Sequence, residues 1–287
     1  MTKRRKLMKK IFALVLAMLM MFSFAACGGN TTPETTDPAT GSDAATDTAA
    51  KETVVVGYTI YEPMNYLDEN GKLVGFDTEL AEAVFGNLGY EVIFLEIEWS
   101  SKYTDLDSGT IDCVWNGFTA NTADDDGVMR ADKVDFSYNY MENRQVVVVK
   151  ADSGIATAAD LSGKFGVAES GSAGEAYAKE FEGVNFKGFI KQTECLTEIS
   201  AGTADFAVVD AQLAKSYVGK GDYADLAIVE ELSSDVEFYA IGFKKGSLLT
   251  ANVNAQLEAL AADGTISALA EKYGVANTAI TDFSDQK

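Results

Sequence analysis

The sequence predicts an α/β protein of two lobes, each built on a mainly parallel β-sheet flanked by helices. From Thr53 onward, β-branched strand-like runs alternate with segments whose apolar residues recur at helical spacing. This order places parallel strands side by side with helices on both faces of the sheet. The alternation starts again after VVVV at 146–149, and about 235 residues in two similar blocks indicate two lobes rather than one domain.

The first block contains strand-like runs, a hairpin-like segment and two helical segments. TVVVGYTI at 53–60 is typical of a short buried strand, and Asn70-Gly71 is a turn signal. Asp77 is expected to cap a helix that ends at Gly89. The remaining expected elements are a strand at 90–99, a helix at 100–110 and a strand at 111–115.

The second block repeats this pattern and ends in a single long helix, expected at 248–274. Ligands bind at the carboxyl ends of the strands in such sheets, so a cleft between the two lobes is the expected site. The strands of this block are expected at 165–170, 185–190, 204–210 and 236–243, and its shorter helices at 173–181, 194–202 and 211–218.

Residues 1–26 predict an export signal, because a basic cluster is followed by an apolar run and small residues. The alternative is an uncleaved membrane anchor, for which the apolar run is short. The sequence AAC at 25–27 resembles the lipobox of bacterial lipoproteins, with Phe24 where a leucine is usual. This resemblance implies cleavage before Cys27 and acylation of that residue, which supplies a stable membrane anchor. Residues 27–52 are polar and predict a disordered tether.

Charge and composition exclude several classes of function. The chain has a formal net charge of -21, and removal of the leader leaves 17 basic against 44 acidic residues, a net of -27. Such a chain is not expected to bind nucleic acid or anionic lipid by charge. Histidine is absent, which excludes histidine-based catalysis and histidine metal ligands. Cys113 and Cys195 are expected to be small buried thiols, with a disulfide as the alternative.

Four segments together resemble one family. They are VGYTIYEPMNYLDENGKLVGFDTELAEAV, LDSGTIDCVWNGFTAN, RADKVDFSYNYMENRQVVVV and GKFGVAESGSAGEAYAKE. In this order and spacing they resemble the bacterial family 3 solute-binding proteins, which serve polar amino-acid ABC importers. The resemblance covers residues 53–275.

This resemblance implies a clamshell fold with two hinge crossovers, near Asn143 and near 238–240. The first lobe would comprise 53–143 and 238–287, with the last helix, and the second lobe would comprise 144–237. It implies that the protein captures a free amino acid outside the cytoplasm and delivers it to an ABC permease, with no cofactor. A monomer held at the outer face of the cell membrane by lipidated Cys27 is the expected state.

Arg130 matches the arginine that stands seven residues before the serine of the family's Asp-Phe-Ser segment, here Ser137. Its planar guanidinium can pair with a substrate carboxylate through two hydrogen bonds, each worth about 1.5–3 kcal/mol. The alternative is a surface arginine paired with Asp126 or Asp132. Extra residues at 122–129 would either displace Arg130 or bulge outward.

Two loops complete the expected substrate contacts. By resemblance, a carbonyl of the loop containing Asn116 and Gly117 accepts the substrate ammonium, and Thr119 donates a hydrogen bond; alternatively, Thr119 only caps a turn. Gly171 and Ser172 precede a helix whose free N–H groups form an anion site, although Ser172 is also suited to an ordinary N-cap.

Asp210 matches the aspartate that pairs with the substrate ammonium, and its alternative role is to cap helix 211–218. Tyr61 and Trp99 match the two aromatic residues that sandwich the substrate side chain, with Phe118 and Trp115 as alternatives for this wall. Family members for cationic substrates often carry an acid near the position of Tyr58. Its absence disfavours lysine and histidine as substrates, with Glu62 as a nearby alternative acid.

Because Arg130 and Thr119 lie on one lobe and Ser172 and Asp210 on the other, bound substrate would favour the closed state. Two other functions remain open. One is a cyclohexadienyl-dehydratase-like enzyme on the same fold, which needs a general acid in the cleft. The other is a receptor ectodomain, which needs a transmembrane helix and a cytoplasmic domain.

Overall fold

The computed structural model describes residues 51–286. The predicted export signal, Cys27 and nearly all of the predicted tether lie outside these residues. Within the described part of the chain, no helix is both long and apolar enough to cross a bilayer.

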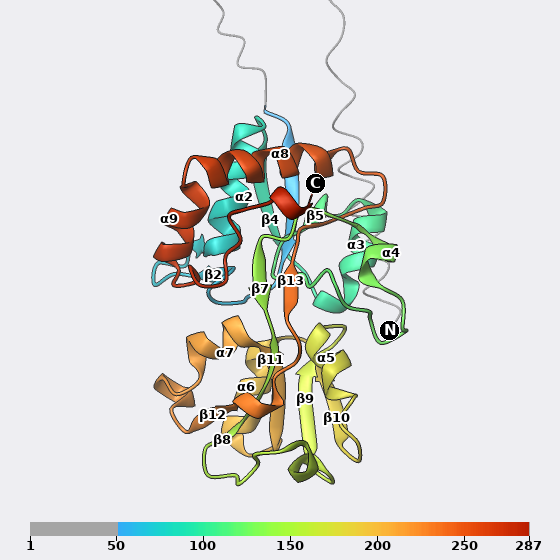
Figure 1. Cartoon of the computed structure of the whole chain (residues 1–287), viewed down its shortest axis with the longest axis vertical. Helices are drawn as coiled ribbons and strands as arrows, with labels where there is room; N and C mark the ends of the chain where they lie inside the picture. Colours follow the sequence, from blue (N-terminus) through green and yellow to red (C-terminus); the bar gives the residue numbers. More distant parts are fainter. Residues whose placement is uncertain (1–50, 287) are drawn as a thin grey trace, which may run out of the picture. The chain divides into compact units, whose positions relative to one another are not determined.

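The first lobe is built on a five-stranded sheet that the chain enters at its first strand (Figure 1). Strand β1 lies between β4 and β5, and both pairings are parallel. The sheet order is β4 (Glu91–Glu96), β1 (Thr53–Tyr58), β5 (Cys113–Val114), β14 (Gly242–Phe243) and β6 (Asp135–Phe136). A small antiparallel hairpin, β2 (Tyr66–Leu67) and β3 (Leu73–Val74), confirms the predicted turn at Asn70-Gly71.

The helices of the first lobe come from both ends of the sequence. Helix α2 packs against β4 and against the two C-terminal helices, α8 and α9, so the last helices belong to this lobe. The bounds are α2 (Phe76–Asn87), α3 (Lys102–Ser108) after a 3₁₀ turn η1 (Trp99–Ser101), α4 (Arg130–Lys133), α8 (Leu249–Ala262), α9 (Thr265–Lys272) and a terminal 3₁₀ turn η5 (Ser284–Gln286).

The second lobe repeats this plan around a second five-stranded sheet. Its order is β10 (Asn185–Phe189), β9 (Phe165–Glu169), β11 (Phe206–Asp210), β8 (Gln145–Lys150) and β12 (Leu226–Val229). Three helices pack against it: α5 (Ala173–Ala178), α6 (Gln192–Ala201) and α7 (Ala211–Tyr217). Three 3₁₀ turns, η2 (Ala158–Leu161), η3 (Gly221–Tyr223) and η4 (Glu230–Leu232), complete the lobe.

Two antiparallel strands connect the lobes. β7 (Met141–Asn143) pairs with β13 (Glu237–Tyr239), and Figure 1 shows this ribbon running between the two sheets. In each sheet four of the five strands share one direction. The reversed strand, β8 or β14, directly follows one of the two crossings, so it enters its sheet from the opposite end.

Two local predictions are wrong, and one open alternative is resolved. Asp77 does not cap α2. Gly75 is the N-cap residue, and Asp77 lies in the first turn of the helix with its side chain fully buried. The predicted long C-terminal helix is two helices, because the chain adopts a left-handed backbone at Gly264 (φ 85°). Cys113 and Cys195 are free and buried, as the thiol interpretation predicts.

Candidate functional site

A small cavity of about 10 Å³ lies where the two lobes meet. It is polar, and each lobe supplies half of its ten lining residues. Trp99, Asn116, Gly117, Thr119 and Arg130 line it from the first lobe, and Glu169, Ser172, Ala173, Gln192 and Asp210 from the second. A more open groove, lined in part by the exposed Asp125 and Asp235, borders the same interface.

Arg130 begins the short helix α4, and its side chain is only 1% exposed. Its Nε donates to Asp124 Oδ1 over 2.8 Å, Nη1 to the carbonyl of Thr119 over 3.3 Å, and Nη2 to the carbonyl of Gly171 over 3.3 Å. A guanidinium has five N–H donors. One N–H on Nη1 and one on Nη2 therefore remain available to a ligand such as a carboxylate.

The extra residues before Arg130 form a tight hairpin that holds it in place. Ala123 and Met129 pair as an antiparallel bridge, Gly127 turns the chain with φ 76°, and the N–H of Arg130 donates to the carbonyl of Thr122. The hairpin therefore extends directly into helix α4.

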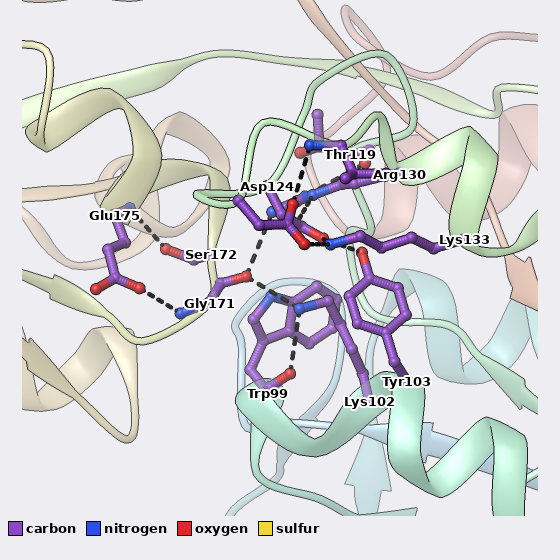
Figure 2. A network of polar contacts seen from close by, with 12 residues as sticks. Trp99, Lys102, Tyr103, Thr119, Asp124, Arg130, Lys133, Gly171, Ser172 and Glu175 are labelled. Atoms are coloured by element: carbon purple, nitrogen blue, oxygen red, sulfur yellow. Dashed lines mark hydrogen bonds and ion pairs between the residues drawn. The ribbon is translucent and has the colours of Figure 1, made fainter.

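The acidic side chains of this hairpin do not all face solvent, although an outward bulge would require this. Asp124 points inward and is nearly buried, with hydrogen bonds from Arg130, Tyr103 and Lys133 (Figure 2). Burial alone would raise the pKa of Asp124, but the charge of Arg130 and the hydrogen bonds from Lys133 and Tyr103 lower it to about 2. Asp124 is thus an ionised partner that fixes the guanidinium. The alternative pairing with Asp126 or Asp132 is not formed; Asp126 pairs with Lys133.

A second buried cation, Lys102 on α3, lies beside Arg130. Its ammonium donates to the carbonyl of Gly171 over 3.0 Å and contacts the Trp99 carbonyl, and it lies 4.6 Å from the ring centroid of Tyr103. Figure 2 shows the side chains of Lys102 and Arg130 converging on the Gly171 carbonyl. Burial, followed by the charge of Arg130, lowers the pKa of Lys102 to about 7. Two first-lobe cations thus hold one carbonyl of the second lobe.

Gly117 lies in the loop after β5 with a left-handed backbone, φ 59°. A Cβ at this position would lie 2.7 Å from Cε1 of Tyr61 and about 3.0 Å from the ring of Tyr239. Its N–H donates to Asp77, whose carboxylate also accepts from the Tyr140 hydroxyl. Burial raises the pKa of Asp77 to about 7.

Tyr61 therefore lies behind Gly117 rather than on the cavity wall, and its hydroxyl is 2.6 Å from that of Tyr239. Asn116 lines the cavity but has its hydrogen bonds satisfied by the protein. It accepts from the Thr59 hydroxyl and donates to the Thr59 carbonyl and to Asn65. Asn116 therefore braces the loop.

Asp210 ends β11 on the opposite side of the cavity. It stands at the N-cap position of α7, yet its side chain makes no capping hydrogen bond. Its carboxylate accepts instead from the amides of Asn143, Gln145 and Gln192. Burial raises the pKa of Asp210, and these hydrogen bonds oppose the rise. The geometry disfavours the simple capping role.

Glu237, on crossing strand β13, extends this network to the first lobe. It accepts hydrogen bonds from Gln145 over 2.8 Å and from the Thr119 hydroxyl over 3.2 Å. Burial, then the charge of Asp210, raises the pKa of Glu237 to about 7. The loop at Thr119, the crossing ribbon and Asp210 are therefore linked by continuous hydrogen bonds.

The second lobe contributes a helix start and a further acid. Ser172 caps α5 by accepting from the N–H of Glu175, which leaves its hydroxyl hydrogen available to a ligand. Glu169, at the end of β9, is 3% exposed and lines the cavity. Burial, then the charge of Asp210, raises the pKa of Glu169 to about 8.

Trp99 closes the first-lobe side of the cavity, 5% exposed and edge-on to Phe118 at 5.2 Å. Phe118 packs behind it, 5.5 Å from the guanidinium carbon of Arg130, and Trp115 lies in the core against Phe85. Neither of these two alternatives lines the cavity. Within residues 51–286, no cluster of acidic or cysteine side chains could hold a metal ion.

The structure brings seven of the nine residues expected from the sequence to this cavity; Tyr61 lies behind its wall and Gly171 at its edge. Sequence reasoning missed Glu169, Ala173, Gln192 and the bracing pair Lys102 and Asp124. Glu169 ends a strand expected to point at the cleft, and that position could have identified it. Nothing in the sequence marks Lys102, which stands among polar residues at the start of a helix.

Comparison with known proteins places this chain in a family. Residues 54–276 match the model of the bacterial extracellular solute-binding proteins, family 3. The arginine-binding extracellular protein ArtP of Bacillus subtilis is 28% identical over 93% of this chain and 98% of its own length. The L-cystine-binding protein TcyA of the same organism is 30% identical over 93% of this chain and 97% of its own.

Two solved structures are similar in fold and sequence. An ancestral arginine-binding protein bound to arginine superposes with a TM-score of 0.70 at 35% identity, over 78% of this chain and 98% of that chain. The ancestral amino acid-binding protein AncCDT-1, a precursor of cyclohexadienyl dehydratase, gives 0.68 at 30% identity, over 77% and 95%.

Proposed function

Because the chain belongs to the bacterial extracellular solute-binding proteins of family 3, we propose that it is the extracytoplasmic substrate-binding component of an amino-acid ABC importer. It captures a free amino acid between its lobes and presents the closed form to the permease. Its relatives ArtP and TcyA are named for the binding of arginine and L-cystine, which supports an amino acid as the ligand.

One observation carries this proposal. Arg130 and Asp210 line the same cavity from opposite lobes, and Arg130 keeps two N–H donors without a protein partner among the described residues. An α-amino acid at neutral pH has a carboxylate and an ammonium on one carbon. The carboxylate pairs with the Arg130 fork, and the ammonium with Asp210.

The neighbouring groups complete this clamp. The Ser172 hydroxyl and the Thr119 loop contribute to holding the two α-groups, and Trp99 covers the side chain. Tyr61 shapes the pocket from behind by holding Gly117. Since the contacts come from both lobes, substrate stabilises the closed arrangement more than an open one, and the ribbon of β7 and β13 is the hinge.

The predicted export signal, lipobox and tether at the N-terminus indicate where the protein acts in the cell. We expect cleavage before Cys27 and lipidation of that residue, with residues 27–52 acting as a tether for a monomeric body near the permease. Cys27→Ser would release the protein from the membrane fraction. Retention of this variant on the membrane would contradict the lipid anchor without affecting the ligand assignment.

An amino-acid panel tests the function directly. Titration calorimetry of the purified protein with the common amino acids should give tight one-to-one binding for one or a few of them. Native mass spectrometry of the protein as isolated should show the bound ligand. No binding across the panel would overturn the proposal.

A dehydratase-like enzyme remains the second candidate. The similarity to AncCDT-1 and the presence in the cavity of Glu169, an acid whose pKa is raised to about 8, favour testing it. The assay supplies prephenate or arogenate and follows formation of the aromatic product. We expect no turnover; measurable turnover would replace the transport assignment.

A further inference from the structure

The proposed α-amino-acid clamp leaves one charged group in the cavity without a role. Arg130 is assigned to the ligand carboxylate and Asp210 to its ammonium. Of the charged residues that line the cavity, only Glu169 remains. Its carboxylate is nearly fully buried, and it forms no ion pair with any lysine or arginine of residues 51–286.

Among the described residues, no cationic side chain pairs directly with Glu169. The charge of Lys102 lowers the pKa of Glu169, but the Lys102 ammonium donates its hydrogen bonds to the carbonyls of Trp99 and Gly171 and forms no ion pair with Glu169. The other charged groups that act on it, Asp210 and Glu194, are acids. A buried carboxylate surrounded in this way is costly unless it is protonated or receives a cation.

The remaining polar lining has little hydrogen-bonding capacity to offer a ligand side chain. The oxygen of Gln192 accepts from the N–H of Asp210 and its amide nitrogen donates to the Asp210 carboxylate. Asn116 is committed to Thr59 and Asn65. A hydrogen bond from Gln192 also lowers the pKa of Glu169, but this neutral amide brings no charge, so the Glu169 carboxylate can still take a cationic group of a ligand.

We propose that Glu169 selects the substrate side chain, and that the substrates are α-amino acids whose side chain carries a cation: a guanidinium, an ammonium or an imidazolium. This inference rests on the proposed function. The side-chain cation supplies the charge that Glu169 lacks, and the Trp99 ring provides an aromatic face beside it. It also revises the expectation drawn from Tyr58, because the second lobe, rather than the first strand, provides the acid.

A charge partner of this kind has a measurable consequence. Without ligand, Glu169 is largely protonated near pH 7, because its pKa is raised to about 8 by burial and by Asp210. A cationic side chain favours the ionised form, so binding should release a proton. Lys102, Asp210 and Glu194 also face Glu169, so the release must be compared between variants rather than read from one protein.

The test compares pairs of ligands of similar shape, one with a cationic side chain and one with a neutral side chain. By calorimetry, wild type should bind arginine at least 100-fold more tightly than citrulline, or lysine by the same margin over norleucine. Glu169→Gln should lose at least 30-fold in affinity for the cationic ligand and change less than threefold for its neutral analogue. Proton release, measured at pH 7 in buffers of different ionisation enthalpy, should approach one per site in wild type and largely disappear in the variant.

Glu62→Gln is the matched control, since Glu62 is the other acid to which the sequence points. It should keep wild-type affinities and proton release. If Glu169→Gln fails to fold, as judged by circular dichroism, Glu169→Asp replaces it and should weaken the cationic ligand selectively.

The outcomes separate the two levels of the proposal. Equal or tighter binding of neutral amino acids by wild type would overturn the role of Glu169 and leave the transport function standing. So would unchanged cation affinity in Glu169→Gln. Failure to bind any amino acid would overturn the proposed function itself.

Discussion

Arg130 Nε and Asp124 Oδ1 lie 2.8 Å apart, with both side chains nearly buried. The aspartate comes from the extra hairpin that precedes the arginine. Asp124 takes the Nε of the guanidinium, and one N–H on each terminal nitrogen is left without a protein partner among the described residues. The hairpin therefore holds Arg130, the residue proposed to bind the substrate carboxylate, in position instead of displacing it.

Asp124→Asn should weaken amino-acid binding by about 5- to 20-fold, because a neutral amide holds the Arg130 guanidinium in place by a weaker hydrogen bond than a carboxylate does. The pKa of Asp124 is lowered to about 2, so its ion pair adds stability above the ordinary aspartate pKa, and this stability is lost as pH falls toward 2. The variant should lose about 1–2 kcal/mol at pH 7 and less at pH 3. Urea unfolding at both pH values measures this.

Asp126→Asn is the control for that experiment. Asp126 is exposed, lies in the same hairpin and pairs with Lys133. It should leave both the affinity and the stability close to those of wild type, because its ion pair is exposed and screened by solvent. An equal effect of both variants would mean that the net charge of the hairpin matters rather than the pair with Arg130.

Arg130→Lys should reduce amino-acid affinity at least 100-fold, about 3 kcal/mol, although the charge is retained. A lysine ammonium cannot replace three protein contacts and still offer two parallel N–H donors to a carboxylate. Arg144→Lys is the matched control, because Arg144 is exposed, donates to the Ser234 carbonyl and does not line the cavity. Calorimetry with the best ligand decides; unchanged affinity in Arg130→Lys would remove this residue from the site.

The sequence carries most of the information about the fold and the position of the site. Period-two and helical patterns predict the alternating elements, since they report which face of each element is buried. Contacts between segments that are far apart in the sequence cannot be predicted from these patterns. Asp77 has the sequence context of a helix cap, and only packing against Gly117 and Tyr140 reveals it as a buried brace.

The same limit applies to the charges around the cavity. Asp124, Asp125 and Asp126 are equivalent in a sequence, yet the hairpin turns only the first onto Arg130. Glu169 becomes a specificity candidate only when its partners in three dimensions are known. Local sequence predicts elements, whereas the partners of buried polar groups depend on contacts between segments far apart in the chain.

Gly117→Ala should destabilise the protein by about 2–4 kcal/mol and abolish tight binding. The left-handed backbone disfavours any side chain, and the added Cβ would meet Tyr61 at 2.7 Å. Gly71→Ala is matched in backbone conformation, with φ 77°, but its Cβ would meet open space. It should cost only about 1 kcal/mol and leave binding intact. Thermal unfolding and calorimetry of both variants test this, and equal losses would show that the backbone conformation alone matters.

Glu237→Gln should make the ligand-free protein less sensitive to pH. The pKa of Glu237 is raised to about 7 from an ordinary 4.5, so the folded state binds a proton that the unfolded state has released. Its contribution to stability is complete below pH 4.5 and is lost as pH rises through 7. The glutamine variant should match wild type at pH 4.5 and be more stable at pH 8 by about 1–3 kcal/mol.

Denaturant unfolding of the ligand-free protein between pH 4.5 and 8 measures this difference. The Glu237→Gln variant should still lose stability across this range, though less steeply than wild type, because burial also raises the pKa of Asp77 and Glu169. Glu142→Gln, an exposed position on the partner strand of the same ribbon, should follow the wild-type curve. A glutamine variant that loses stability at pH 8 would show that the charged form of Glu237 supports the hinge, and that its hydrogen bonds from Gln145 and Thr119 outweigh the cost of its burial.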